Sequence, residues 1–194
     1  MPYNVVPLSK EEWKGHPLPM DYETHDYYDV SIAKTLDSFG VKLQKKHVNE
    51  PIVHTSEEYD FPDSLYQDHW EKAEAFGVIE YGELIGAIEI CPEEWSNRLM
   101  VTELWVHENH RKNGVGKALM DYAKERAIAD NRRAIILETQ SCNFNAIGFY
   151  LHEGFDLIGF DSCCYTNADI ERREVRLDLG WFPPKWKGVA KRRE

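Results

Sequence analysis

Apolar and polar residues follow a clear periodic pattern only after residue 76. Residues 76–90 hold two apolar runs on either side of Tyr81-Gly82-Glu83, which predicts a β-hairpin. Residues 98–106 are rich in β-branched and aromatic side chains and predict the next strand. From residue 114 to 130 the apolar residues recur at helical intervals, and the face expected to be buried carries Val115, Leu119, Tyr122, Ala123 and Ala127.

The pattern continues to the C-terminal part of the chain. Residues 134–140 look like a buried strand, so the helix before them is expected to cross over and cover a sheet. Residues 142–155 predict a short helix, and Gly154 near its end suits a helix C-cap. Two closing strands are predicted at 156–166 and 174–182. This order of elements indicates an α/β (α+β) fold.

The first third of the chain is harder to interpret. Residues 31–40 fit a strand or a helix, and residues 50–63 look like an extended segment followed by a loop. A helix is predicted at 64–75, where Leu65, Trp70 and Ala73 roughly share a face.

A single main domain is expected, because the chain has 194 residues and no composition shift marks a second domain. We divide it into an N-terminal arm at 1–30, the domain at 31–182 and a basic C-terminal tail at 183–194. The hydrophobic share of 42% is enough for one core.

The net charge of −11 argues against a general nucleic-acid binder, which needs surplus Lys and Arg to meet phosphates. An acidic surface does suit a cationic small molecule, although the same charge can serve solubility alone. No apolar run approaches the ~18 residues that cross a bilayer, and the N-terminus lacks the pattern of a signal peptide. A cytoplasmic protein without a membrane partner is therefore expected.

The four cysteines give no sign of a metal site. Cys91, Cys142, Cys163 and Cys164 form no CxxC pair and no cluster with zinc-ligand spacing. We expect them to be reduced and structural, and we expect no metal.

The stretch from Arg111 to Lys117 carries the strongest chemical signal. It lies between a strand and an amphipathic helix, so its backbone N–H groups fall at the positive end of the helix. Gly114 and Gly116 allow the backbone to approach a ligand closely, and Arg111 and Lys117 add positive charge. Such a loop suits a pyrophosphate. The alternative is a plain strand–loop–helix connection in which the glycines serve only the turn.

Other nucleotide and metal motifs do not fit this stretch. A Walker A loop needs Gly at position 111 and Ser or Thr after Lys117, where the chain has Arg111 and Ala118. A dinucleotide fingerprint starting at Gly114 needs a small residue at Leu119. The zinc motif HExxH, if begun at His107, needs His at position 111.

Two motifs resemble those of the GNAT N-acetyltransferase superfamily. Arg111-x-x-Gly114-x-Gly116 matches its R/Q-x-x-G-x-G/A signature, and Asn143-x-x-Ala146-x-x-x-Tyr150, followed by Gly154-Phe155, resembles its second signature. The resemblance covers roughly residues 76–180. Residues 137–140 (LETQ), with Asn143 and Phe149-Tyr150, are more closely similar to streptothricin acetyltransferases.

The resemblance implies a GNAT fold, a mixed twisted sheet in which two parallel strands splay apart between flanking helices. Acetyl-CoA is the expected co-substrate, with its pantetheine arm bonded to the strand edge like an added strand and its pyrophosphate on the loop. Asn143 is expected to hydrogen-bond the pantetheine arm. The cofactor-binding residues implied in this way are Leu104, Trp105, Val106, Arg111, Lys112, Asn113, Gly114, Val115, Gly116, Lys117, Asn143, Ala146 and Tyr150.

The mechanism follows from the chemistry of amine acylation. An alkylammonium with a pKa near ~10 must lose a proton before it attacks the thioester. Glu103 is the first candidate for the base, the alternative being a surface or substrate-orienting carboxylate. Tyr150 is the candidate acid for the leaving thiolate, the alternative being a core aromatic residue. The Val106 N–H is expected to meet the oxyanion, and Glu138 and Tyr165 are expected on the substrate side.

The substrate pocket is the least defined part. Its aromatic walls and acidic groups are expected among Tyr27, Tyr28, Tyr59, Trp70, Trp95, Tyr165, Trp181, Glu57, Glu58 and Asp60, although most of these aromatic residues should belong to the core. The leading function is acetylation of a small cationic amine, streptothricin first. The alternatives are a protein or polyamine acetyltransferase and a non-catalytic coenzyme A sensor. The sequence leaves open whether the chain forms a homodimer.

Overall fold

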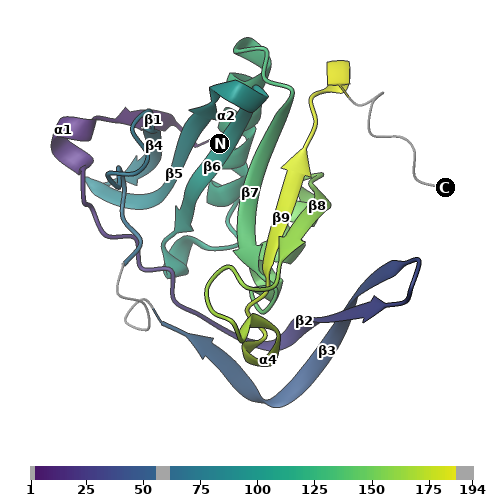
Figure 1. Cartoon of the computed structure of the whole chain (residues 1–194). Coiled ribbons are helices and arrows are strands. Elements are labelled where there is room, and N and C mark those ends of the chain that lie inside the picture. Colours follow the sequence, from purple (N-terminus) through teal and green to yellow (C-terminus); the bar gives the residue numbers. More distant parts are fainter. Residues whose placement is uncertain (1–2, 56–61, 187–194) are drawn as a thin grey trace. The chain divides into compact units, whose positions relative to one another are not determined.

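The computed structural model describes residues 3–55 and 62–186, and in them a mixed sheet has the strand order β1-β4-β5-β6-β7-β9-β8 (Figure 1). Its strands are β1 (Val5–Leu8), β4 (Glu74–Glu80), β5 (Glu83–Glu93), β6 (Arg98–Val106), β7 (Ala134–Gln140), β8 (Asp156–Asp161) and β9 (Arg176–Trp181). A separate two-stranded sheet consists of β2 (Tyr22–Lys34) and β3 (Phe39–His54). The helices are α1 (Lys10–Trp13), α2 (Val115–Ala129), α3 (Phe144–His152) and α4 (Asp169–Arg172). The predicted α/β class is confirmed.

Most elements predicted after residue 76 are confirmed. β4 and β5 form the hairpin, and Tyr81 and Gly82 at its turn both have positive φ, 51° and 86°, as a tight two-residue turn requires. β6 has the predicted bounds, and β7, α3 and β9 lie inside the predicted segments. In α2 the predicted face is buried apart from the half-buried Tyr122, and the structure adds Met120 to it.

The helix predicted at 64–75 is wrong. In place of a helix, Ser64 bridges to Pro17, and Ala75 already belongs to β4. Leu65 and Tyr66 are both buried, and Tyr66 has a left-handed φ of 59°, which does not occur inside a right-handed helix. Contacts with distant parts of the chain therefore override the local pattern.

The remaining uncertain segments also have a defined structure. Within the expected arm, β1 pairs antiparallel with β4. Residues 31–40 belong to the strands β2 and β3 and the turn between them. In the expected tail the short 3₁₀ helix η4 spans Pro184–Trp186, and residues 187–194 lie outside the described residues, as do Glu57, Glu58, Tyr59 and Asp60. No helix in the described ranges is long and apolar enough to cross a membrane.

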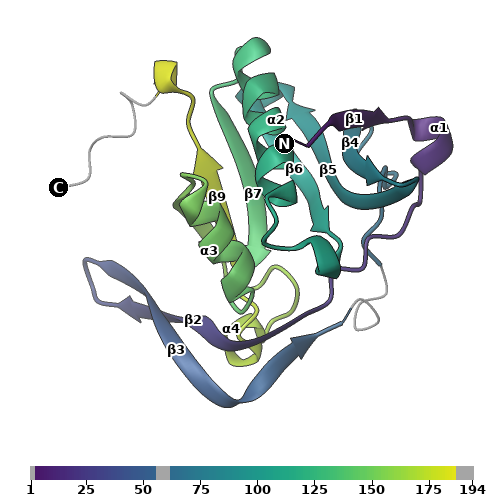
Figure 2. The same ribbon diagram turned by 180° about the vertical axis from the view of Figure 1, so that it is seen from behind.

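The chain divides into two compact units, one of residues 1–20, 56–137 and 180–194, the other of residues 21–55 and 138–179. In the first unit, α2 packs on β5 (Figure 2), where a Cβ at Gly86 would lie 2.6 Å from the Val115 Cγ1. A second cluster is built from residues of β1, β4, β5, β6 and the segments 18–20 and 65–73, with Leu8, Leu18, Leu65, Tyr66, Ala75, Ala87 and Trp105 at its centre.

The second unit has its own apolar cluster. It consists of four residues that are buried together: Val30 of β2, Ile147 of α3, Leu177 of β9 and Val175, which directly precedes β9. The β2–β3 hairpin is thus anchored at Val30, which pairs with Leu43 and lies nearer the tip than the base, while Phe39 at the tip is 75% exposed.

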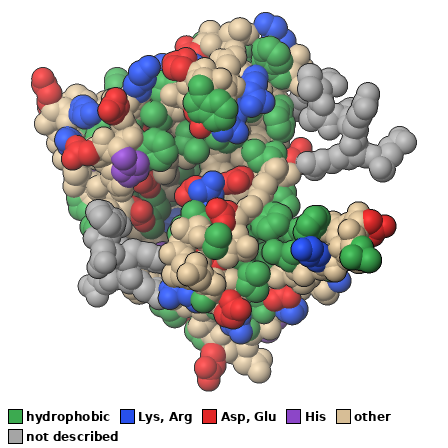
Figure 3. Space-filling model, in the orientation of Figure 1, with side chains coloured by type: hydrophobic (Ala, Val, Ile, Leu, Met, Phe, Trp, Pro, Cys, Tyr) green, Lys and Arg blue, Asp and Glu red, His purple; other side chains and the backbone are tan. Residues whose placement is uncertain are grey.

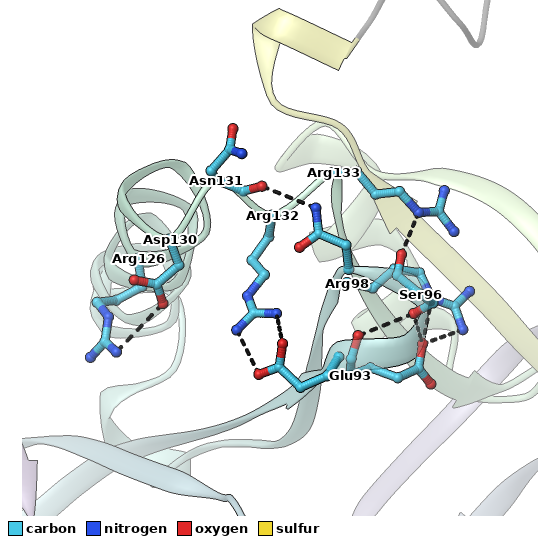
Figure 4. A network of polar contacts seen from close by, with 10 residues as sticks. Glu93, Ser96, Arg98, Arg126, Asp130, Asn131, Arg132 and Arg133 are labelled. Atoms are coloured by element: carbon cyan, nitrogen blue, oxygen red, sulfur yellow. Dashed lines mark hydrogen bonds and ion pairs between the residues drawn. The ribbon is translucent and has the colours of Figure 1, made fainter.

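Polar contacts join two turns of the first unit (Figure 4). Arg132, after α2, holds Glu94 of the 3₁₀ helix η2 (Glu94–Ser96) through two bonds of 2.9 and 3.0 Å. The Arg133 Nε donates to the Ser96 backbone oxygen at 2.6 Å. These contacts lie where β6 and β7 begin their parallel pairing at Arg98 and Ala134, so they fix the register from which the two strands start.

Candidate active site

The end of β6 has the backbone arrangement that the sequence predicts. β6 pairs antiparallel with β5 as far as Gly86 and Val106. Its parallel pairing with β7 covers only Arg98 to Met100. Beyond Met100 the parallel ladder has ended, which agrees with the expected splaying of two parallel strands.

The side chains along this part of β6 serve different purposes. Trp105 is 7% exposed and its Nε1 donates to the Pro19 carbonyl at 3.0 Å, so its ring belongs to the core and only its backbone remains for a ligand. Leu104, Val106 and Glu103 are half-buried. Glu103, the acidic residue of β6 itself, is therefore partly reached by solvent.

The loop after β6 leads into α2 through two left-handed residues. The 3₁₀ helix η3 (Glu108–His110) comes first, Lys112 has φ 64° and Gly114 has φ 92°. Gly114 is the N-cap of α2 and makes no side-chain cap, and residues 111–114 are exposed. Because the first N–H groups of a helix have no partner within the helix, this loop presents donors to an anion.

The charged residues of the loop also have contacts within the protein. The Arg111 Nε donates to the Val106 carbonyl at 3.1 Å, which ties the loop to the strand end. Lys117 forms an ion pair of 2.7 Å with Asp121, one turn further along α2. Asn113 is exposed, Gly116 is half-buried and Val115 is buried. The predicted loop residues are thus together, and their ligand remains a prediction.

In the second unit, Asn143 is the N-cap of α3. Its Oδ1 accepts the Ala146 N–H at 3.2 Å. Asn143 and Ala146, two residues of the second motif, therefore also have a structural role at the start of α3. The amide NH₂ of Asn143 is not used by this cap. The sequence analysis missed the capping role, although Asn before a predicted helix is a recognised signal.

The segment before Asn143 links three elements of the second unit. The Ser141 carbonyl accepts the Tyr28 N–H at 2.9 Å, and the Ser141 N–H donates to the Val175 carbonyl at 2.8 Å. The Tyr22 hydroxyl donates to the Gln140 Oε1 at 2.7 Å. The segment resembling streptothricin acetyltransferases therefore also holds the β2–β3 hairpin in place.

Tyr150 lies on α3 and is 9% exposed. Its ring contacts those of Phe149 and Phe155, with centroids 5.5 and 6.0 Å away, and its carbonyl accepts the Phe155 N–H at 3.0 Å. Packing therefore fixes this ring. Its proposed acid role stays a prediction.

Glu138 of β7 already has a cationic partner. It forms an ion pair of 3.1 Å with Arg176, which also contacts Asp178 at 3.0 Å. Desolvation raises the pKa of the Glu138 carboxyl and Asp178 adds to this, whereas Arg176 lowers it. Tyr165 lies in the loop after β8, where its N–H donates to the Asp169 Oδ2 at 3.0 Å.

The other residues considered from the sequence divide between core and surface. Tyr27 and Trp181 are buried, Tyr28, Trp70 and Tyr165 are half-buried, and Trp95 is 83% exposed, so fewer of the described aromatic residues belong to the core than expected. All four cysteines are free; Cys91 and Cys142 are buried, whereas Cys163 and Cys164 are exposed, so the structural role expected of all four does not extend to that pair. Within the described ranges no group of three or more His, Cys, Asp or Glu could hold a metal ion.

A buried carboxylate was missed by the sequence analysis. Glu89, in the middle of β5, is 0% exposed. The Tyr66 N–H donates to its Oε2 at 2.5 Å, and the Thr102 hydroxyl donates to its Oε1 at 2.8 Å. Burial raises the pKa of this carboxyl. The available signal was a lone Glu inside an apolar run, between Ile88 and Ile90.

Comparisons with known proteins agree with this arrangement. The model of the "Acetyltransferase (GNAT) family" matches residues 44–155. The streptothricin acetyltransferase of Streptomyces lavendulae is 32% identical over 162 residues, covering 79% of this chain and 81% of that protein. The streptothricin acetyltransferase of Escherichia coli is 30% identical over 115 residues, covering 59% of this chain and 66% of that protein.

Solved structures give the same result for the fold. A nourseothricin acetyltransferase is 25% identical, with a TM-score of 0.72 over 95% of this chain and 100% of its own. A Bacillus anthracis protein in complex with acetyl coenzyme A is 21% identical, with a TM-score of 0.70 over 93% of this chain and 99% of its own.

Proposed function

The chain belongs to the GNAT acetyltransferase family, whose acetyl donor is acetyl-CoA, and we propose that it acetylates a primary amine of a small cationic molecule. The match to the Streptomyces lavendulae enzyme over 79% of the chain carries the choice of streptothricin as first substrate. Acetylation removes a positive charge from the amine, so resistance to the antibiotic is the biological role proposed.

For the donor, we assign the loop before α2 to the pyrophosphate. Exposed backbone around Gly114, the N-terminus of a long helix and the cations Arg111 and Lys117 support this assignment. Beyond Met100 the edge of β6 is free of the β7 ladder, which suits hydrogen bonding to pantetheine in the manner of an added strand. The amide NH₂ of Asn143 supplies a donor to the same arm.

For the chemistry, we assign the general base to Glu103 and the general acid to Tyr150. The carboxylate takes a proton from the substrate ammonium, and the amine lone pair then attacks the thioester carbonyl. The Val106 N–H stabilises the oxyanion, and the phenol protonates the leaving thiolate. The amine displaces coenzyme A directly, so no acyl-enzyme forms.

On the substrate side, Glu138 and Tyr165 are the proposed contacts. Because Arg176 is already 3.1 Å from Glu138, a substrate cation that binds this carboxylate must share it with Arg176 or displace it. We therefore expect Glu138→Gln to raise the KM for the amine more than it lowers kcat.

The proposal is tested by measuring thiol release from acetyl-CoA with purified protein and a panel of streptothricin, a polyamine and an amine-terminated peptide. Fast turnover with streptothricin supports it, and a raised inhibitory concentration in a sensitive bacterium that expresses the chain supports the resistance role. Turnover with the peptide or the polyamine alone selects the second enzymatic candidate. Tight acetyl-CoA binding without thiol release across the panel indicates a sensor.

Assembly and location also remain proposals. A homodimer is tested by light scattering on the purified chain, and a cytoplasmic location by fractionation of the expressing cells.

A further inference from the structure

The carboxylate of Glu89 is buried, and both of its oxygens accept hydrogen bonds. One donor is the backbone of Tyr66, 23 residues earlier, and the other is the Thr102 hydroxyl on the next strand. An N–H and an O–H both donate to it, which suits the ionised carboxylate. A buried carboxylate held in this way requires a reason, because its desolvation is costly.

Glu89 lies directly opposite Glu103. The two are Cα partners in the antiparallel pairing of β5 and β6, so their side chains leave the same face of the sheet, with Cβ atoms about 5 Å apart. The pairing shifts immediately after Glu89, where Ile90 faces Val101. This β-bulge leaves Thr102 as the extra residue, and its hydroxyl reaches Glu89.

The two carboxylates differ in exposure. Glu89 is 0% exposed, whereas Glu103 is half-buried. The other charged groups near Glu89 are Lys10 and His69, which lower its pKa, while burial raises it. The inner carboxylate is thus fixed and screened from water, and the outer one is accessible.

We propose that Glu89 is a positioning residue that makes Glu103 more basic, through a fixed negative charge directly across the strand pair. Each of two like charges at this separation raises the proton affinity of the other, so an ionised Glu89 strengthens the hold of Glu103 on a proton. The proton passes from the substrate ammonium to the Glu103 carboxylate, and the freed lone pair attacks the thioester, while Glu89 exchanges no proton. The inference rests on the proposed role of Glu103 as base.

A raised pKa serves the reaction because an ordinary glutamate is a weak base for an ammonium. A base becomes more effective as its pKa approaches the operating pH. The same hydrogen bonds hold the turn at Tyr66 against the sheet, so the charge is kept at a fixed place.

The inference is tested by ¹³C NMR titration of the glutamate carboxyls in the full chain, with Glu103 assigned by Glu103→Gln. In Glu89→Gln the pKa of Glu103 should fall by about 0.5 to 2 units, the range that Coulomb's law gives for charges about as far apart as the Cβ atoms, with an effective dielectric constant between ~80 and ~20. An unchanged Glu103 pKa overturns the inference. Glu83→Gln, six residues earlier on β5 and exposed, is the control and should leave Glu103 unchanged.

A second measurement applies even if Glu89→Gln does not fold. Coupling between two sites is reciprocal, so Glu103→Gln must lower the pKa of Glu89 by the same amount. If the pKa of Glu89 is the same in Glu103→Gln as in the wild type, the inference is overturned.

Kinetics separate this inference from the proposed function. With an accepted amine, the acid limb of kcat/KM should move to lower pH in Glu89→Gln, should stay in place in Glu83→Gln and should be lost in Glu103→Gln. If the acid limb of kcat/KM is lost in Glu103→Gln but does not move in Glu89→Gln, the role of Glu89 is overturned, while the proposed enzymatic function is unaffected. If the wild type releases no thiol with any amine, the proposed function fails, and the NMR coupling still decides the charge interaction.

Discussion

The buried carboxyl of Glu89 makes stability depend on pH. Burial raises its pKa above the ordinary 4.5, so the folded chain keeps this proton to a higher pH than the unfolded chain. Its contribution is most favourable below the unfolded pKa and is lost as pH rises through the folded pKa. In urea titrations, the unfolding free energy of Glu89→Gln relative to wild type should therefore increase across this window, then level off. A difference that does not vary with pH contradicts the prediction.

Tyr150 gives a prediction that separates chemistry from packing. Tyr150→Phe keeps the ring between Phe149 and Phe155, so stability and acetyl-CoA affinity should change little. If the phenol protonates the thiolate, kcat should fall by about 10²-fold or more. Calorimetry with acetyl-CoA and rapid-quench measurement of turnover test the two parts. An unaltered rate removes Tyr150 from the mechanism.

Residues in local motifs were predictable, and residues defined by distant partners were not. The loop around Gly114 could be predicted because a glycine, nearby cations and a following helix are all visible within a few residues. The role of Glu89 could not be predicted, because it depends on hydrogen bonds from Tyr66 and Thr102, which come close to it only in the folded protein. The same holds for Glu138, whose pairing with Arg176 needs β7 and β9 in place.

At the scale of elements, the placement of α2 depends on one glycine. A Cβ at Gly86 would lie 2.6 Å from the Val115 Cγ1 and 3.3 Å from the Trp105 carbonyl oxygen, so Gly86→Ala must push the helix from β5. We expect a loss of about 1–3 kcal/mol in unfolding free energy. Because α2 presents the loop, acetyl-CoA affinity should fall too. Chemical denaturation and calorimetry measure both effects.

Gly148 supplies the matched control for this substitution. It lies in α3, and a Cβ there meets nothing within 4 Å. Gly148→Ala should raise stability by about 0.5–1 kcal/mol, since alanine favours the helix and restricts the unfolded chain. Equal losses in the two variants would contradict the steric argument.

The elements that the sequence did not define are those with weak local signals. The β4–β5 hairpin has a two-residue turn and apolar strands, so it could be predicted. The β2–β3 hairpin is mostly exposed and polar, and its anchoring comes from Ile147 and Val175, far along the chain. In residues 64–75 the spacing of Leu65, Trp70 and Ala73 resembled a helical face, but Leu65 and Tyr66 belong to a turn whose Tyr66 N–H is bound by Glu89.

At the scale of the whole molecule, charge is the property that the sequence predicts most directly. The net charge is −11, yet acidic and basic side chains are interspersed on the face shown in Figure 3. Many are paired, as in Arg126 with Glu74 at 3.1 Å. Such exposed pairs contribute little to stability individually. The unbalanced negative charge acts instead at longer range, on the approach of charged ligands.

This long-range effect predicts how salt changes the kinetics. The screening length falls from about 30 Å at 0.01 M to about 8 Å at 0.15 M salt, which weakens the attraction of a cationic substrate. For an amine with three positive charges, kcat/KM should fall roughly threefold to tenfold over this range, through KM, while kcat stays constant. A substrate with one positive charge should lose much less. Initial-rate measurements at several salt concentrations test this, and equal losses for both amines would mean that the net charge has no part in substrate capture.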